Sequence, residues 1–177
     1  MRSVLWFATM VAIAANGHAQ EPSKSEKGKV TKSLYMVTGL HCPPCTATLE
    51  GSLKKIKGVE SIKVDFKGTY TTIEFQEDII SAQQIAGAIS ATPHMMGRNM
   101  QYGGALVLSV AGVQDEALGQ KATAALSKVE GVSKVTLYPK QEAVGIEFNA
   151  KGKVTSKQLI DALELAGLKG SQYGAGR

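Results

Sequence analysis

The sequence predicts an α+β protein made of two tandem copies of one β-α-β-β-α-β unit. The first indication is an alternation of extended apolar runs with segments whose apolar residues recur at helical spacing. The second is that the same order of segments restarts after Gly103-Gly104. The third is a short strand-to-helix loop that carries both cysteines of the chain, Cys42 and Cys45.

The first nineteen residues have the layout of a secretory signal. Arg2 supplies a positive charge, Val4 to Ala15 form a short apolar run, and Ala19 precedes the expected cleavage point. The apolar run is shorter than a membrane-spanning helix requires. We therefore expect a cleaved signal peptide at residues 1–19 and a mature protein that is exported, periplasmic or extracellular, without stable membrane insertion after cleavage.

The rest of the composition excludes several classes of function. Residues 20–32 are polar apart from Val30, which is typical of a flexible leader. The net charge of +5 comes from lysines interleaved with acids, with no basic run that carries aromatic residues, and this argues against a nucleic-acid partner. We find no catalytic carboxylate pair, Ser/His/Asp set or phosphate loop, so we expect no enzyme activity.

The first copy is expected at residues 33–102. Its elements are predicted at Ser33–Thr38 (strand), Pro43–Ile56 (helix), Val59–Phe66 and Tyr70–Gln76 (strands), Ser81–Ala91 (helix) and within Met95–Tyr102 (strand). Lys57-Gly58 ends the first helix, and Ser81 is placed to cap the second. This order is the ferredoxin-like plan, in which two helices cover one face of a four-stranded antiparallel sheet.

The second copy is expected at residues 105–173, because the chain matches itself at a shift of 73. The matched pairs include Val37/Val110, Gly39/Gly112, Leu53/Leu126, Gly58/Gly131, Ile73/Ile146 and Phe75/Phe148. With one residue inserted, Ser81, Ile85 and Ile89 meet Thr155, Leu159 and Leu163. Core positions are kept, but Asp115 and Leu118 replace the two cysteines. We interpret the second copy as a degenerate unit that serves as a scaffold or partner surface.

The run Gly39-Leu40-His41-Cys42-Pro43-Pro44-Cys45 resembles the Gly-x-x-Cys-x-x-Cys signature of heavy-metal-associated domains. That family includes copper chaperones, the N-terminal modules of copper-transporting ATPases and the periplasmic mercury-binding protein, to which residues 126–135 are also similar. The resemblance covers both copies and implies that Cys42 and Cys45 bind metal as thiolates. As partners it implies a membrane metal transporter or another metal-binding protein. Leu40 departs from the family, which usually has Met there.

Two thiolates without an obligatory third ligand suit a soft ion of low coordination number. We expect Cu(I) first, and Hg(II) or another soft divalent ion second; structural zinc normally takes four ligands. The loop after the second helix is expected at the same end of the sheet as the cysteines. His41, His94, Met95 and Met96 are therefore auxiliary candidates, each with a plainer interpretation as a core or surface residue.

The function we expect is scavenging or handover of a soft ion through the dithiolate. Cys-Pro-Pro-Cys at a helix start is also typical of thioredoxin-type oxidoreductases, although the duplicated short unit does not match that fold. A thiol–disulfide redox protein, or a pure interaction module with the cysteines oxidised, therefore stays open as the alternative.

Overall fold

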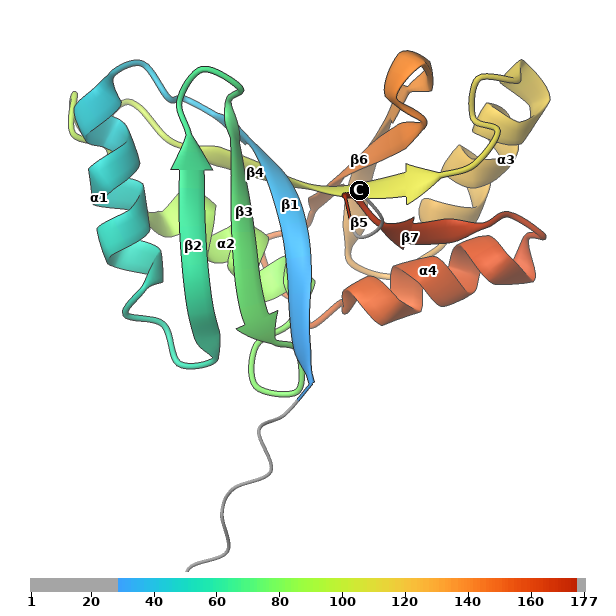
Figure 1. Cartoon of the computed structure of the whole chain (residues 1–177), viewed down its shortest axis with the longest axis horizontal. Coiled ribbons are helices and arrows are strands. Elements are labelled where there is room, and N and C mark those ends of the chain that lie inside the picture. Colours follow the sequence, from blue (N-terminus) through green and yellow to red (C-terminus); the bar gives the residue numbers. More distant parts are fainter. Residues whose placement is uncertain (1–28, 175–177) are drawn as a thin grey trace, which may run out of the picture.

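The computed structural model describes residues 29–174, so the expected signal peptide and most of the leader lie outside the described residues. The elements in chain order are β1 (Val30–Thr38), α1 (Pro43–Leu53), β2 (Val59–Asp65), β3 (Tyr70–Gln76), α2 (Ala82–Ala91), β4 (Gly103–Val110), α3 (Glu116–Leu126), β5 (Val132–Tyr138), the 3-10 turn η1 (Pro139–Gln141), β6 (Ala143–Phe148), α4 (Ser156–Leu165) and β7 (Gly170–Gln172). Figure 1 shows two groups of helices and strands with β4 passing from one to the other.

The described strands form one antiparallel sheet in the order β2-β3-β1-β4-β6-β5, with β7 also paired to β4. Each copy contributes two helices, as the ferredoxin-like plan requires. The predicted α+β class with two tandem ferredoxin-like units is confirmed. None of the helices in residues 29–174 has the length and apolar character needed to span a bilayer.

Strand β4 belongs to both copies. Residues 103–107 pair with β1, while residues 106–109 pair with β6 on the opposite edge. Residues 108–110 pair with β7, which follows β1 along the same edge of β4. The hydroxyl of Ser33 in β1 donates to Gln172 Oε1 in β7 at 2.9 Å, so these two strands also meet.

The prediction of a strand within Met95–Tyr102 is wrong, because the structure has no strand between α2 and β4. This segment contains turns, and the exposed side chains of Met95 and Met96 point to solvent rather than into a sheet. The edge of β1 is completed instead by the first strand of the second copy, whose Leu106 is fully buried in the core. Gly103-Gly104, after which the order of segments restarts, is therefore the beginning of a strand.

The duplication is visible in the element boundaries. α1 and α3 are offset by 73 residues, as are β2 and β5, and α2 and α4 are offset by 74. Gly39 and Gly112 both have positive φ, 86° and 81°. Ser81 and Thr155 each form a capping box at the start of the second helix of their copy, which confirms the predicted Ser81 cap.

Other predicted boundaries shift by a few residues. β1 begins at Val30, inside the expected leader, because residues 30–32 continue the pairing with β3. α1 ends at Leu53 rather than Ile56, since the Ile56 N–H bonds to the carbonyl of Leu53 in a tighter turn. β2 ends at Asp65 rather than Phe66, because the Asp65 carboxylate accepts the Gly68 N–H at 2.7 Å and turns the chain.

One contiguous hydrophobic core runs through both copies. Its fully buried side chains include Leu49, Leu53, Ile73, Phe75, Ile85 and Ile89 from the first copy and Leu106, Leu108, Leu126, Ile146, Leu159 and Leu163 from the second. Burial of a side chain of this size contributes roughly 1.5–3 kcal/mol. The two units are therefore stabilised together and not as separate cores.

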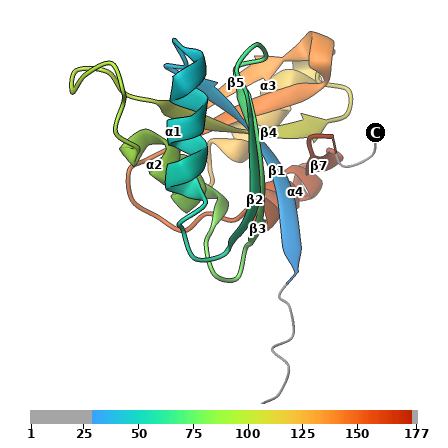
Figure 2. The same cartoon turned by 60° about the vertical axis from the view of Figure 1, so that its left-hand side comes forward.

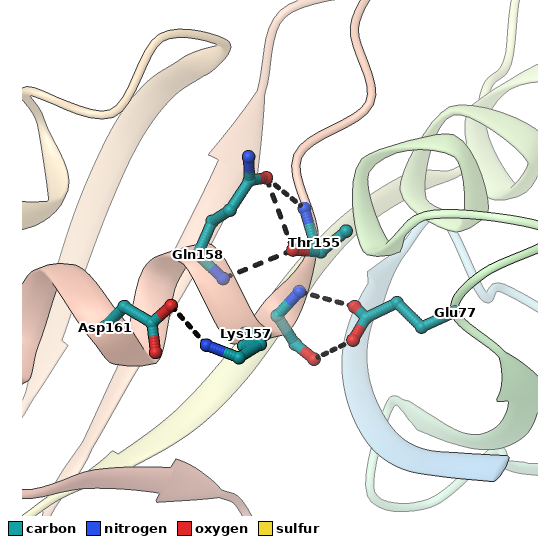
Figure 3. Close-up of polar contacts among 6 residues, drawn as sticks. Glu77, Thr155, Lys157, Gln158 and Asp161 are labelled. Atoms are coloured by element: carbon teal, nitrogen blue, oxygen red, sulfur yellow. Dashed lines mark hydrogen bonds and ion pairs between the residues drawn. The ribbon is translucent and has the colours of Figure 1, made fainter. Parts of the chain in front are cut away.

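Polar contacts also join the copies. Gln83 on α2 is only 3% exposed, and its side-chain amide donates to the carbonyls of Asn149 (2.9 Å) and Lys151 (3.1 Å). Glu77 accepts the backbone N–H of Ser156 and its hydroxyl, the latter at 2.9 Å, at the start of α4 (Figure 3). A carboxylate from the first copy thus satisfies a free N–H in the first turn of a helix in the second.

Candidate metal site

The two cysteines lie in residues 39–45, here called the thiol loop, between β1 and the first turn of α1. Gly39 has φ +86°, and a Cβ at this position would lie 2.5 Å from the carbonyl oxygen of Gln101. Leu40 is buried and anchors the loop in the core, as expected for an apolar residue in place of Met. The loop therefore leaves the sheet in close contact with the backbone that precedes β4.

Cys42 and Cys45 are brought together at the start of α1. Cys42 is the N-cap residue, with Pro43 and Pro44 in the first turn, where a missing N–H costs least. The Cys45 N–H donates to the Cys42 carbonyl at 3.0 Å, and the two Cα atoms are 5.3 Å apart. Their position at a helix N-terminus favours the thiolate form.

The two thiol groups differ in exposure. Cys45 is fully buried against the core, whereas Cys42 is partly exposed. The sulfurs are joined as a disulfide in this structure. A disulfide offers no thiolate to a soft ion, so the metal-binding form of the loop is the reduced one.

His94 lies beside the thiol loop, and both of its ring nitrogens are used within the chain. Nδ1 accepts the Met96 N–H at 3.1 Å, and Nε2 lies 2.8 Å from the carbonyl of Gly39. Since Nδ1 is the acceptor, the proton belongs on Nε2, which donates to Gly39. In this conformation His94 presents no lone pair to an ion, and its role as an auxiliary ligand stays a prediction.

The other auxiliary candidates are more exposed. The His41 ring centroid is 5.8 Å from that of His94, and Met95 and Met96 are 58% and 59% exposed. In Figures 1 and 2 the start of α1 and the loop from α2 to β4 lie together at the top of the molecule. The structure thus brings the expected loops to one end of the sheet, with soft thioether groups at its rim.

Tyr102 is a site residue that sequence reasoning missed. It is only 2% exposed, its hydroxyl donates to the Cys45 carbonyl at 3.4 Å, and its ring centroid is 4.6 Å from that of His94. Burial raises the pKa of Tyr102, so the hydroxyl stays protonated and remains a donor. A tyrosine that precedes a Gly-Gly pair carries no signal of this role.

The corresponding loop in the second copy has no thiols. Asp115 occupies the position of Cys42 and caps α3 by accepting the Leu118 N–H at 3.0 Å. Leu118 occupies the position of Cys45 and is 37% exposed. In residues 29–174 no group of three or more His, Cys, Asp or Glu side chains is placed to hold a metal ion.

The thiol loop does not line the groove on the open face of the sheet. That groove, about 590 Å³, lies over β1, β3, β4 and β6 and includes Met36, Tyr70 and Tyr138. Cys42 and Cys45 instead belong to an open loop at the end of the sheet. Such a location suits exchange of an ion with another protein rather than enclosure of a ligand.

Comparison with known proteins identifies the family. The model of the heavy-metal-associated domain matches residues 27–94. The copper chaperone CopZ of Enterococcus hirae is 32% identical over 59 residues, which cover 33% of this chain and 86% of the chaperone. The chain belongs to the heavy-metal-associated domain family. Domains of this family are metal-binding modules.

Larger relatives and solved structures are also similar to this heavy-metal-associated protein. Copper-transporting ATPase 1 of Rattus norvegicus is 30% identical over 131 residues, 73% of this chain but only 8% of the ATPase. The water-soluble region of the P-type ATPase CopA from Bacillus subtilis is 21% identical, covers 83% of this chain and 93% of its own, and has a TM-score of 0.41. Oxidised MerP from Ralstonia metallidurans CH34 is 19% identical, covers 44% and 97%, and has a TM-score of 0.38.

Proposed function

We propose that this protein is an exported carrier or scavenger of a soft metal ion, which Cys42 and Cys45 bind as thiolates after reduction. The observation that carries the proposal is the placement of both cysteines at the start of α1, with Cα atoms 5.3 Å apart, in a chain of the heavy-metal-associated family. Two converging sulfurs at an open loop suit an ion of low coordination number.

Cu(I) is the ion we favour, and Hg(II) is the second choice. The matched relatives include proteins named for copper, a chaperone and transporting ATPases. Met95 and Met96 would add thioether ligands that suit copper. The expected signal at residues 1–19 supports export, and a membrane metal transporter or another metal-binding protein is the proposed partner.

Handover would proceed by ligand exchange. A thiolate of the partner adds to the bound ion, a three-coordinate intermediate forms, and one cysteine of this chain leaves. A second thiolate of the partner then displaces the remaining cysteine in the same way. Cys42 is the first to leave, because it is partly exposed while Cys45 is fully buried. The ion changes protein without being released to water, and no electron is transferred.

A Cu(I) competition titration against a chromogenic chelator tests the proposal. Reduced mature protein is expected to bind one equivalent tightly, and the Cys42→Ser/Cys45→Ser variant is expected to lose it. Asp115→Ser/Leu118→Ser at the equivalent positions of the second copy is the matched control, since Ser remains a good helix N-cap. Its titration should equal that of the wild type. Absence of tight binding by the wild type would contradict the copper proposal and leave Hg(II) as the ion to titrate.

The paired sulfurs favour one second candidate, a thiol–disulfide exchange protein. A redox function predicts that the pair is oxidised at the potential of its compartment and exchanges with substrate disulfides. Measurement of the Cys42–Cys45 reduction potential against glutathione separates the two candidates. A cysteine pair that stays reduced at the potential of its compartment supports the metal site, because only the thiolates can bind a soft ion.

A further inference from the structure

We propose that His94 and Tyr102 are positioning residues that fix the two ends of the thiol loop in the geometry that a soft ion requires. The inference rests on the proposed metal-binding function and deepens it. Neither side chain would touch the ion. Each holds a backbone carbonyl of the loop, one at Gly39 and one at Cys45.

His94 holds the first end. Its Nε2–H donates to the Gly39 carbonyl at 2.8 Å, and the Met96 N–H fixes the tautomer by donating to Nδ1 at 3.1 Å. The side chain is only 9% exposed, so solvent competes little for these bonds. The imidazole therefore links the loop after α2 to Gly39, the residue that follows β1.

Tyr102 holds the second end. Its hydroxyl donates to the Cys45 carbonyl at 3.4 Å, and its ring packs against His94 with the centroids 4.6 Å apart. Gln101, the preceding residue, has its carbonyl in the place where a Cβ of Gly39 would lie. One segment, residues 94–102, thus contacts the thiol loop before and after the cysteines.

The second copy provides an internal comparison. At the shift of 74 that relates α2 to α4, Leu168 occupies the position of His94, and it is buried to a similar degree, 5% exposed. A hydrophobic residue therefore fills this position where the cysteines have been replaced. The imidazole is present only in the copy that has Cys42 and Cys45, which links it to the thiol loop rather than to packing of the fold.

A fixed loop lowers the entropic cost of bringing two sulfurs to one ion. Cys45 is the buried, anchored sulfur, and the carbonyl held by Tyr102 is its own. Loss of either contact should let the loop sample geometries in which the sulfurs do not converge. We expect weaker metal binding with little change in the stability of the fold.

The test compares His94→Leu, which introduces the residue of the second copy, with His94→Gln, which keeps a side-chain donor. Tyr102→Phe removes the hydroxyl at the other end, and Gln120→Leu is the control at an exposed side chain on α3, away from the thiol loop. For each reduced protein we would measure Cu(I) affinity by competition, hydrogen–deuterium exchange of residues 39–45, and the urea midpoint of unfolding.

For His94→Leu we expect Cu(I) affinity to fall about tenfold and exchange in the thiol loop to accelerate, with a near-normal urea midpoint. His94→Gln should recover part of the loss in affinity, Tyr102→Phe should show a smaller loss, and Gln120→Leu should match the wild type. Unchanged loop exchange and affinity in both His94→Leu and Tyr102→Phe would overturn the inference. If wild-type protein binds no Cu(I), the copper proposal fails, whereas the exchange measurement still decides whether these residues fix the loop. If His94→Leu does not fold, His94→Gln and Tyr102→Phe decide it.

Discussion

Gln83 and Val154 hold each other across the boundary between the two copies: the Gln83 N–H donates to the Val154 carbonyl, and the Val154 N–H donates to Gln83 Oε1, both at 3.0 Å. The Gln83 amide nitrogen also bonds two carbonyls of the same loop. A single buried glutamine therefore satisfies four backbone groups of the second copy, three of them through its side chain, which makes it the first residue to test for the coupling of the copies.

Replacement of Gln83 by Leu should lower the free energy of unfolding by about 2–4 kcal/mol, because it leaves buried backbone groups at Asn149, Lys151 and Val154 without their partner. Urea denaturation of reduced, metal-free protein measures this change. Gln120→Leu is the control, since Gln120 is exposed and bonds only Glu116 on the same helix. A loss within about 0.5 kcal/mol for Gln83→Leu would show that the copies are coupled by other contacts.

Replacement of Glu77 by Ala should destabilise the protein by about 1–2 kcal/mol, because Ser156 loses the acceptor of its N–H and hydroxyl at the start of α4. Asp78→Ala, at the exposed neighbouring carboxylate, should change stability little. Hydrogen exchange should locate the effect in α4 rather than in the first copy. Protection lost evenly over both copies would argue against a local capping role.

A fragment that ends at Tyr102 should fail to form a stable monomer. It lacks β4, so the edge of β1 at residues 34–38 would lose its partner strand and expose free backbone groups. Circular dichroism and size-exclusion chromatography of residues 29–102 and of the longer fragment 29–174 give the comparison. A folded, monomeric 29–102 fragment would mean that residues 95–102 can supply a strand of their own.

Cysteines introduced into the second copy should create a second, weaker site. Asp115→Cys/Leu118→Cys restores the motif spacing at the start of α3, and we expect one additional Cu(I) equivalent with about tenfold lower affinity than the first. The reason is that Leu168 offers no hydrogen bond to the loop. Adding Leu168→His should reduce the difference in Cu(I) affinity between the two sites. Equal affinities without this third substitution would contradict the importance of the His94 contact.

Stability should fall at alkaline pH, in part through Tyr35. Its buried hydroxyl donates to the Ala82 carbonyl at 3.2 Å. Burial, and secondarily the negative charge of Glu77, raise the pKa of Tyr35 well above its usual value of 10.0. The folded form then holds this proton more tightly than the unfolded form, so the contribution is complete below pH ~10 and is lost as pH rises further.

Tyr35→Phe should therefore reduce the alkaline slope, measured as urea midpoints between about pH 8 and pH 11. At neutral pH the variant should lose about 1 kcal/mol from the missing hydrogen bond. The comparison must be of slopes, because burial also raises the pKa of Tyr102 and the wild-type slope has more than one source. Parallel profiles for the two proteins would contradict the assignment to Tyr35.

Apart from the strand expected within Met95–Tyr102, sequence patterns predicted the order of strands and α-helices, the Ser81 cap and the cysteines at the start of α1, because each depends on neighbouring residues. The shared strand was not predicted. Residues 95–102 and 103–107 are both short segments that could extend beside β1, and local periodicity cannot rank two partners for one edge. That choice depends on packing of Leu106 in the common core.

The environment of the site was predicted only in part. The loop after α2 does lie at the end of the sheet where the cysteines are, as topology implied. The burial of His94 and the contact of Tyr102 with Cys45 could not be read from the sequence, because both depend on residues about 55 positions apart in the chain. Non-local hydrogen bonds of this kind leave no periodic signal.

Domains joined by a flexible linker can reorient freely, so a partner that binds one domain does not meet the next domain in a defined orientation. β4 removes that freedom, because its hydrogen bonds to β1, β6 and β7 run without interruption from one copy into the other. The cysteine-free copy is therefore held in a fixed orientation relative to the copy that carries the cysteines. A partner that bound the cysteine-free copy would therefore meet the sulfurs of Cys42 and Cys45 at a constant angle and distance.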